Sequence, residues 1–140
     1  MVYSLFMALT LSIDRRLEDP VYEQVAGQVR QLVASGALVP GTTLPSVRRL
    51  ARDLGVSLNT IARAYRLLEA EGFVVIRDRA GATIAEPAGV DQSVRAKLLD
   101  HLRTTLARLR QTGMATEELL NVIGIEVQAL GRPPEEKQND

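Results

Sequence analysis

The chain has 140 residues, 17 basic and 17 acidic side chains, and no cysteine. This length suits one domain, or a small domain with an appendage, and a hydrophobic share of 46% is that of an ordinary globular protein. Without cysteine, the chain has no disulfides, thiolate metal sites or cysteine nucleophiles. A net charge of zero gives no overall attraction to nucleic acid, so such a function depends on how the charges are distributed.

Residues 1–13 are predicted to form an N-terminal extension. The segment is apolar, but it lacks a basic leader and is too short to span a bilayer, so we expect no cleaved signal peptide. Leu9–Ile13 alternates apolar and polar residues, which predicts a short strand. Met7 is an alternative start to Met1.

The next segment, residues 14–86, begins with a predicted helix. Asp19 is expected to cap it, with Pro20 at its first position and Gly36 at its end. The helical spacing of Tyr22 indicates a role in the core. The apolar face of this helix comprises Val21, Val25, Val29 and either Leu32 or Val33.

Two shorter helical patterns follow. Ser46 is expected to cap the first, which ends at Gly55, and Ser57 is expected to cap the second, which ends at Gly72. Two helices joined by a tight turn containing glycine are typical of a helix-turn-helix. The apolar positions are Val47, Leu50, Ala51 and Leu54 in the first helix, and Ile61, Ala64, Tyr65 and Leu68 in the second.

The opposite face of the second helix is polar. Asn59, Arg63 and Arg66 recur at i, i+4 and i+7, and Thr60 lies beside them near the helix start. In a helix-turn-helix this helix enters the major groove, where Asn pairs with adenine, Arg pairs with guanine, and hydroxyls bind phosphate or base. A polar face on its own is consistent with simple solvation, but the preceding helix, the turn and the following hairpin favour DNA binding.

A β-hairpin is predicted after this helix. Phe73–Arg77 and Ala82–Ala85 flank a short polar loop, which is typical of a hairpin and makes the domain a winged helix-turn-helix. Arg77 and Arg79 lie at or near the tip, where they would reach phosphate or a narrow minor groove. The alternative for the tip is a solvated turn. Between Leu44 and Arg79, seven arginines stand against four acidic residues, so positive charge is concentrated in this segment.

Together, the runs LPSVRRLA (44–51), LGVS (54–57), NTIARAY (59–65) and LLEAEGF (67–73) resemble the winged-helix domain of GntR-type bacterial transcription regulators. The resemblance covers roughly residues 19–86 and implies DNA contacts from both helices and from the wing around Gly81. Many members carry Arg where this chain has Leu58 and Ala62, so base readout is expected to be redistributed. From the spacing and the resemblance together, the predicted DNA-binding residues are Ser46, Arg48, Ser57, Asn59, Thr60, Arg63, Arg66, Arg77, Arg79 and Gly81.

Residues 87–132 are predicted to form a two-helix dimerisation region. Asp91 is expected to cap a long helix that Gly113 ends, and Thr116 is expected to cap a second helix that Gly131 ends. Residues 133–140 are expected to be a disordered tail.

Two amphipathic helices of this size leave apolar surface uncovered, so the hairpin needs a partner surface. That partner is either the winged helix or a second copy of the chain. We favour the second copy, because a symmetric dimer matches the two half-sites of a palindromic operator. The residues predicted at the dimer interface are Leu98, Leu102, Leu106, Leu109, Leu120, Ile123 and Val127.

A short two-helix region of this kind resembles the YtrA-type branch of the family. The resemblance agrees with a dimer and implies repression of a nearby operon, often one for a membrane transporter. The lack of cysteine fits a cytoplasmic protein. About fifty residues leave no room for the ligand-binding or aminotransferase-like domains of longer branches. A small-molecule effector therefore would have to bind at the dimer interface.

An enzyme is not expected. His101 is the sole histidine, and Asp100, its sequence neighbour, points elsewhere on a helix. No nucleophile elbow, phosphate loop or metal-ligand cluster accompanies them, so no catalytic residue, metal or cofactor is predicted. The main alternative is a winged-helix protein-interaction module without specific DNA readout.

Overall fold

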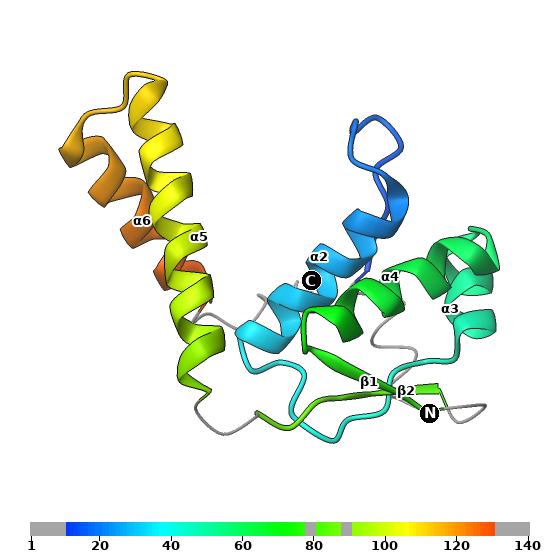
Figure 1. The fold of residues 1–140 in the computed structure, drawn as a ribbon. Helices are drawn as coiled ribbons and strands as arrows, with labels where there is room; N and C mark the ends of the chain where they lie inside the picture. Colours follow the sequence, from blue (N-terminus) through cyan, green and yellow to red (C-terminus); the bar gives the residue numbers. More distant parts are fainter. Residues whose placement is uncertain (1–10, 78–80, 88–90, 131–140) are drawn as a thin grey trace, which may run out of the picture. The chain divides into compact units, whose positions relative to one another are not determined.

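Figure 1 shows the fold in a computed structural model, which describes residues 11–77, 81–87 and 91–130. The chain divides after Glu86 into two compact units. The first contains the helices α2 (Val21–Ala34), α3 (Val47–Leu54) and α4 (Leu58–Ala70) and the strands β1 (Val74–Arg77) and β2 (Gly81–Ile84). The second contains α5 (Gln92–Gln111) and α6 (Thr116–Leu130). This mainly helical architecture with one β-hairpin confirms the predicted fold class.

Helix α2 begins one residue later than predicted. Pro20 holds the N-cap position with extended backbone angles, no side chain caps the helix, and the Pro20 carbonyl accepts hydrogen bonds from the amides of Glu23 and Gln24. The prediction that Asp19 caps this helix is therefore wrong. The reason is local, because the extended backbone of Pro20 keeps it and the residue before it outside the helix. Gly36 follows the helix with φ +80°, as its predicted role requires.

The strand predicted over Leu9–Ile13 is absent from its described part, residues 11–13. The amide side chain of Gln28 instead binds both backbone groups of Ser12, accepting from its N–H at 2.9 Å and donating to its carbonyl at 2.7 Å. A side chain of α2 thus takes the place of a neighbouring strand, and Leu11 is buried beside it.

The predicted caps of the helix-turn-helix are confirmed. Ser46 Oγ accepts a hydrogen bond from the Arg49 amide at the start of α3, and Ser57 Oγ accepts one from the Thr60 amide at the start of α4. Gly55 ends α3 in the left-handed region at φ +68°. A hydroxyl cap satisfies an amide that the helix leaves unpaired, and glycine adopts this φ without steric cost.

The hairpin pairs Val74 with Ile84 at one end and Arg77 with Gly81 at the other. A pairing that the sequence did not reveal lies on the other side of β2. There, the amides of Gly41 and Leu44 donate to the carbonyls of Ile84 and Ala82, and the Ile84 amide donates to the Thr42 carbonyl. Both sides of β2 are therefore hydrogen-bonded.

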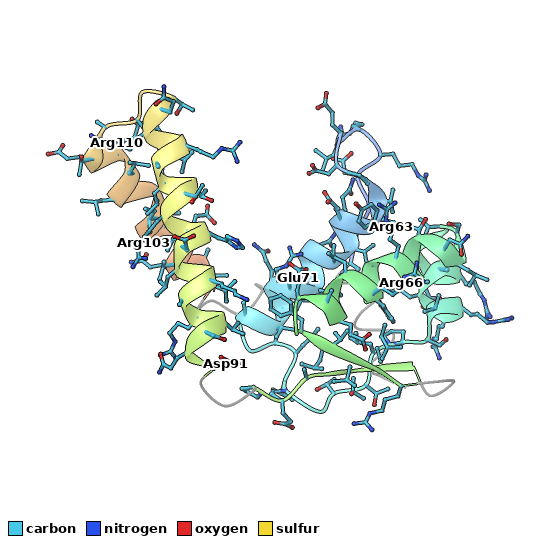
Figure 2. The ribbon with its side chains drawn as sticks, viewed as in Figure 1. Arg63, Arg66, Glu71, Asp91, Arg103 and Arg110 are labelled. Carbon is cyan, nitrogen blue, oxygen red and sulfur yellow. The ribbon has the colours of Figure 1, made fainter. Side chains whose placement is uncertain are left out.

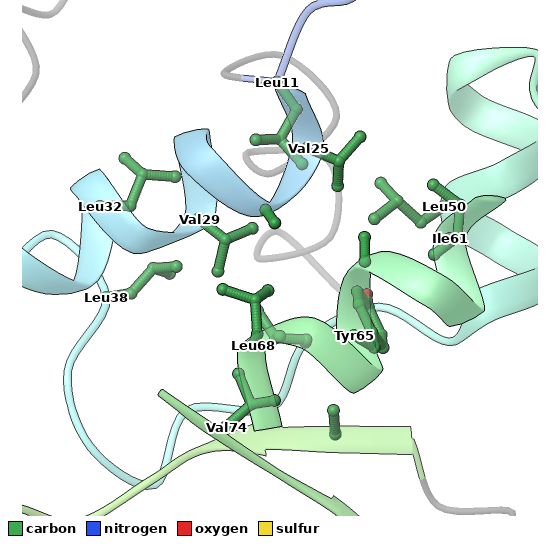
Figure 3. Close-up of a cluster of buried hydrophobic side chains, with 14 of the residues drawn as sticks. Leu11, Val25, Val29, Leu32, Leu38, Leu50, Ile61, Tyr65, Leu68 and Val74 are labelled. Atoms are coloured by element: carbon green, nitrogen blue, oxygen red, sulfur yellow. The ribbon is translucent and has the colours of Figure 1, made fainter. Parts of the chain in front are cut away.

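One hydrophobic core, shown in Figure 3, holds the first unit together. The apolar faces predicted for α2, α3 and α4 converge on it, with Val25, Leu50 and Ile61 fully or almost fully buried. Tyr65 is buried as well, and its hydroxyl donates to the Pro45 carbonyl at 2.6 Å, so its polar end is satisfied.

In the second unit, Asp91 caps α5 as predicted, by accepting from the amides of Ser93 and Val94. The prediction that Thr116 caps α6 is wrong. Thr116 is the first helical residue, the Ala115 carbonyl accepts from the Leu119 amide, and the Thr116 hydroxyl accepts from Arg110 Nη1 at 2.6 Å. The hydroxyl oxygen with which Thr116 would cap the helix therefore accepts a hydrogen bond from Arg110 instead. Gly113 separates the helices at φ +100°, whereas Gly131 and the predicted tail lie outside the described residues.

Within the described ranges, none of the helices has the length and apolar character needed to span a membrane.

Candidate nucleic-acid interface

The outward face of α4 carries the side chains predicted to read DNA. Asn59, Arg63 and Arg66 are exposed, whereas Ile61 and Leu68 on the opposite face are buried in the core. Figure 2 shows Arg63 and Arg66 extending from α4. Burial of one face therefore fixes the orientation of the other, and two guanidinium groups and one amide share a single exposed surface.

The hydroxyls of Ser57 and Thr60 form one structural unit at the start of α4. Their oxygens lie 2.7 Å apart, and Ser57 Oγ also accepts from the Thr60 amide. One hydroxyl donates to the other, so the pair retains one O–H donor for an external acceptor. Both residues predicted to bind DNA thus also shape the helix N-terminus, where backbone amides favour a phosphate.

On α3, Arg48 is exposed, and no described acidic side chain pairs with it. Its neighbour Arg49 lies 3.9 Å from the Asp53 carboxylate, one helical turn further on. The positive charge of Arg49 is therefore partly balanced within the helix, while that of Arg48 is available to a phosphate. Ser46, also predicted to bind DNA, is exposed at the start of α3.

The wing places Arg77 at the end of β1, exposed and paired in register with Gly81. Gly81 has φ +86°, so the fold itself requires a glycine there, whether or not DNA approaches it. Arg79 lies outside the described residues. Glu69 Oε2 accepts from the Ile76 amide at 2.7 Å, which connects the wing to α4.

Two features of this surface were missed by the sequence reasoning. The Arg63 guanidinium lies over the ring of Tyr22, 3.9 Å from its centroid. Tyr22 is half-buried and packs against the core, so the predicted core role is only part of its function. Leu58, at the first position of α4, is 47% exposed. Helical periodicity indicates the face of α2 on which Tyr22 lies. It does not indicate which side chain of α4 lies over the Tyr22 ring.

The residues predicted at a dimer interface fall into two groups. Leu106, Leu109 and Ile123 are half-buried, and Leu119 next to Leu120 is buried at 8% exposure. The remaining four are widely exposed, with Leu98 at 61%, Leu102 at 49%, Leu120 at 66% and Val127 at 61%. The second unit thus leaves much of its apolar surface uncovered.

The residues invoked for an enzyme do not form a site in the described part of the chain. Asp100 and His101 are exposed on α5. In the same residues, no group of three or more His, Cys, Asp or Glu side chains is placed to hold a metal ion.

Comparison with known proteins identifies the family. Residues 21–84 match the model of the gntR family of bacterial regulatory proteins. The chain is 41% identical over 92 residues to the HTH-type transcriptional regulator Rv1152 of Mycobacterium tuberculosis, an alignment covering 66% of this chain and 76% of that protein. It is 40% identical over 78 residues to the HTH-type transcriptional repressor YtrA of Bacillus subtilis, covering 56% of this chain and 60% of that relative.

A solved structure agrees with these relatives over most of the chain. YtrA from Sulfolobus acidocaldarius, a GntR-family transcription factor, aligns with a TM-score of 0.57 and 36% identity, covering 84% of this chain and 96% of that chain. The fold, the helix-turn-helix and the relatives agree, and the chain belongs to the GntR family of bacterial transcriptional regulators, which are not enzymes.

Proposed function

We propose that this chain is a sequence-specific DNA-binding regulator that acts as a homodimer on a palindromic operator and represses a nearby operon. The observation that carries the proposal is the exposed face of α4, where Asn59, Arg63 and Arg66 lie together on a helix held by a buried opposite face. Asn and Arg are the side chains that make two-point contacts with adenine and guanine in the major groove.

The charges around this face support the proposal. Arg48 on α3, which precedes α4, and Arg77 on the wing, which follows it, are both exposed. Neither has an ion-pair partner among the described residues. Arginines of this kind bind phosphates and set the register of a protein on the duplex. We infer that Arg48 and Arg77 position the domain while Asn59, Arg63 and Arg66 read bases.

The uncovered apolar face of α5 and α6 supports dimerisation. Exposed leucines such as Leu98 and Leu102 are costly to hydrate on a helix whose polar residues face elsewhere. A two-fold copy of the same face would cover them and place two copies of α4 against two half-sites. A small-molecule effector would act through this interface.

Repression is inferred from the relative that is named a repressor, YtrA of Bacillus subtilis. From the resemblance to the YtrA-type branch we further propose that the regulated operon encodes a membrane transporter and that the protein works in the cytoplasm, where bacterial DNA lies.

Binding to the DNA upstream of its own gene, measured by mobility shift with competitor DNA, tests the proposal. We expect a specific complex that protects two half-sites about one helical turn or more apart. Arg63→Ala should weaken it; loss of a base contact leaves the salt dependence nearly unchanged, whereas each lost phosphate contact flattens the log–log slope by about 0.9. Arg103→Ala, which removes the same charge from α5, is the matched control.

No specific complex at low salt, or one with the same affinity after Arg63→Ala, would contradict DNA readout by Arg63. Absence of a specific complex would favour the protein-interaction module, whereas an affinity unchanged by Arg63→Ala would place the readout on residues other than Arg63.

A further inference from the structure

The side chain of Arg63 is held against a second helix. It leaves α4 and places its guanidinium over the Tyr22 ring of α2, with 3.9 Å between Cζ and the ring centroid. At this separation a flat guanidinium and an aromatic face are in van der Waals contact. Tyr22 is half-buried and packs against the hydrophobic core, so its ring has less conformational freedom than that of a fully exposed side chain.

Stacking of this kind leaves the hydrogen-bonding groups of Arg63 unused. The five N–H groups of a guanidinium lie in its plane, so contact through one face does not engage them. No described residue accepts a hydrogen bond from Arg63 or forms an ion pair with it. Its donors are therefore oriented but still available to an external acceptor.

A second arginine over an aromatic ring shows the contrast. Arg30 lies over Phe73 at 5.9 Å, but its Nη2 donates to the Glu71 carboxylate at 2.7 Å. Arg30 therefore uses hydrogen-bond donors on an acceptor within the protein. Arg63 contacts a ring, but its donors have no acceptor among the described residues.

We propose that Tyr22 is a positioning residue for DNA recognition, whose ring holds the Arg63 guanidinium ready for a two-point contact with an acceptor pair on DNA. The inference rests on the proposed DNA-binding function. A supported arginine loses less rotamer freedom when it binds than an unsupported one such as Arg66. The acceptor pair is either the O6 and N7 of a guanine or two oxygens of a phosphate.

The test uses the full chain and a duplex recovered with it from a random pool, with affinity measured by fluorescence anisotropy. Tyr22→Leu removes the ring but keeps apolar volume, and Tyr22→Phe keeps the ring. We expect Tyr22→Leu to weaken binding about two- to fivefold, and Tyr22→Phe to bind like the parent. In the Arg63→Ala background, Tyr22→Leu should cause no further loss.

A spectroscopic readout tests the contact without DNA. A proton above an aromatic face is shifted upfield, so the Arg63 Hε resonance of the free protein should lie upfield. It should move toward its ordinary position in Tyr22→Leu but not in Tyr22→Phe. Val33→Ala, at another half-buried position of α2 that packs on the core, controls for general destabilisation. It should leave both the Hε resonance and DNA affinity unchanged.

Replacing each guanine of the duplex by 7-deazaguanine, which lacks the N7 acceptor, separates the two acceptor sources. A guanine contact predicts one position per half-site where the replacement weakens binding, and this loss should disappear in Arg63→Ala. A phosphate contact predicts no such position, and Arg63→Ala should then lower the salt slope by about 0.9 for each subunit of the dimer.

Two results would overturn the proposal. One is binding that requires Arg63 but is unaffected by Tyr22→Leu, which would leave the proposed function intact. The other is an equal loss from Tyr22→Leu with or without Arg63, which would show general damage to the domain. Absence of DNA binding by the parent protein would overturn the proposed function and this inference together.

Discussion

The two units of the chain differ in where their apolar side chains lie. The first unit buries its apolar residues in a core contributed by three helices and the hairpin. In the described part of the second unit, Leu119 is buried while Leu98, Leu102, Leu120 and Val127 remain widely exposed. The first unit therefore gains folding free energy from hydrophobic burial within itself, whereas these four side chains of the second unit are not buried within that unit.

This difference predicts how the effect of a mutation on stability should depend on protein concentration in each unit. Mutations in the core of the first unit should act on folding regardless of protein concentration. Mutations on the exposed face of α5 and α6 should act through association, so their effects should depend on concentration. Two experiments test this distinction directly, and two more test local features of the two units.

The largest effect is expected in the core of the first unit. Leu68 is fully buried, and Leu68→Ala should lower the free energy of unfolding by about 2–5 kcal/mol. Denaturant unfolding at two protein concentrations should give the same loss. Leu120→Ala, at a position 66% exposed, is the comparison, and its loss should grow with concentration. A concentration-independent effect at Leu120 would show that α6 is stabilised within the single chain.

The next largest effect is expected at the exposed face of α5. Leu102→Glu should weaken self-association about thirtyfold or more, as expected when a hydrophobic anchor of an interface is replaced by a charge. Analytical ultracentrifugation measures the dimer constant. Thr104→Glu adds the same charge at an exposed polar position of α5 and should leave the constant nearly unchanged. A Leu102→Glu protein that stays dimeric would place the interface elsewhere.

Two glycines should respond in opposite directions. Gly55 ends α3 at φ +68°, so Gly55→Ala should destabilise the first unit by about 1–2 kcal/mol. Gly124 lies within α6, and an added Cβ meets no atom within 4 Å, so Gly124→Ala should stabilise that helix by up to about 1 kcal/mol. Thermal unfolding followed by circular dichroism measures both. Loss of dimer in Gly124→Ala would indicate that a second chain packs closely against this glycine.

The smallest effect concerns pH. Hydrogen bonds from the Ser93 hydroxyl and from the amides of Val94 and Ser93 hold the pKa of Asp91 below its usual value of 3.8. This lowered pKa means that the cap stabilises α5 fully above the unfolded value, and that the stabilisation is lost as pH falls through the folded pKa. The amide resonances of Ser93 and Val94 should therefore move toward unfolded positions below about pH 4. Asp91→Asn, whose side chain does not titrate, should abolish that movement.

The parts of the fold predicted correctly were those governed by neighbours in sequence. Ser46 and Ser57 cap helices through amides three residues away, and Gly55 has the positive φ that its position after α3 suggests. The apolar faces of α2, α3 and α4 were also predictable, because burial follows the helical repeat.

The wrong caps, Asp19 and Thr116, have local causes, whereas the missed pairings depend on partners far away in sequence. The backbone of Ser12 is satisfied by Gln28, sixteen residues on, so an alternating pattern did not become a strand. The pairing of residues 41–44 with β2 likewise joins segments about forty residues apart. In the candidate site, α4 and its exposed residues were predictable, whereas the contact of Arg63 with Tyr22 required the packing of two helices.

The hydrogen bond from the Ile76 amide to Glu69 has a consequence for solubility. Among the described residues, strand β1 forms the outer edge of the sheet, and Val75 and Ile76 on it are exposed, a combination that invites another chain to add a strand. The Glu69 carboxylate occupies one of the edge donors that an incoming strand would need, and it brings a negative charge to that edge. We expect this side chain of α4 to protect the wing against aggregation, while Arg63 and Arg66 on the same helix remain exposed.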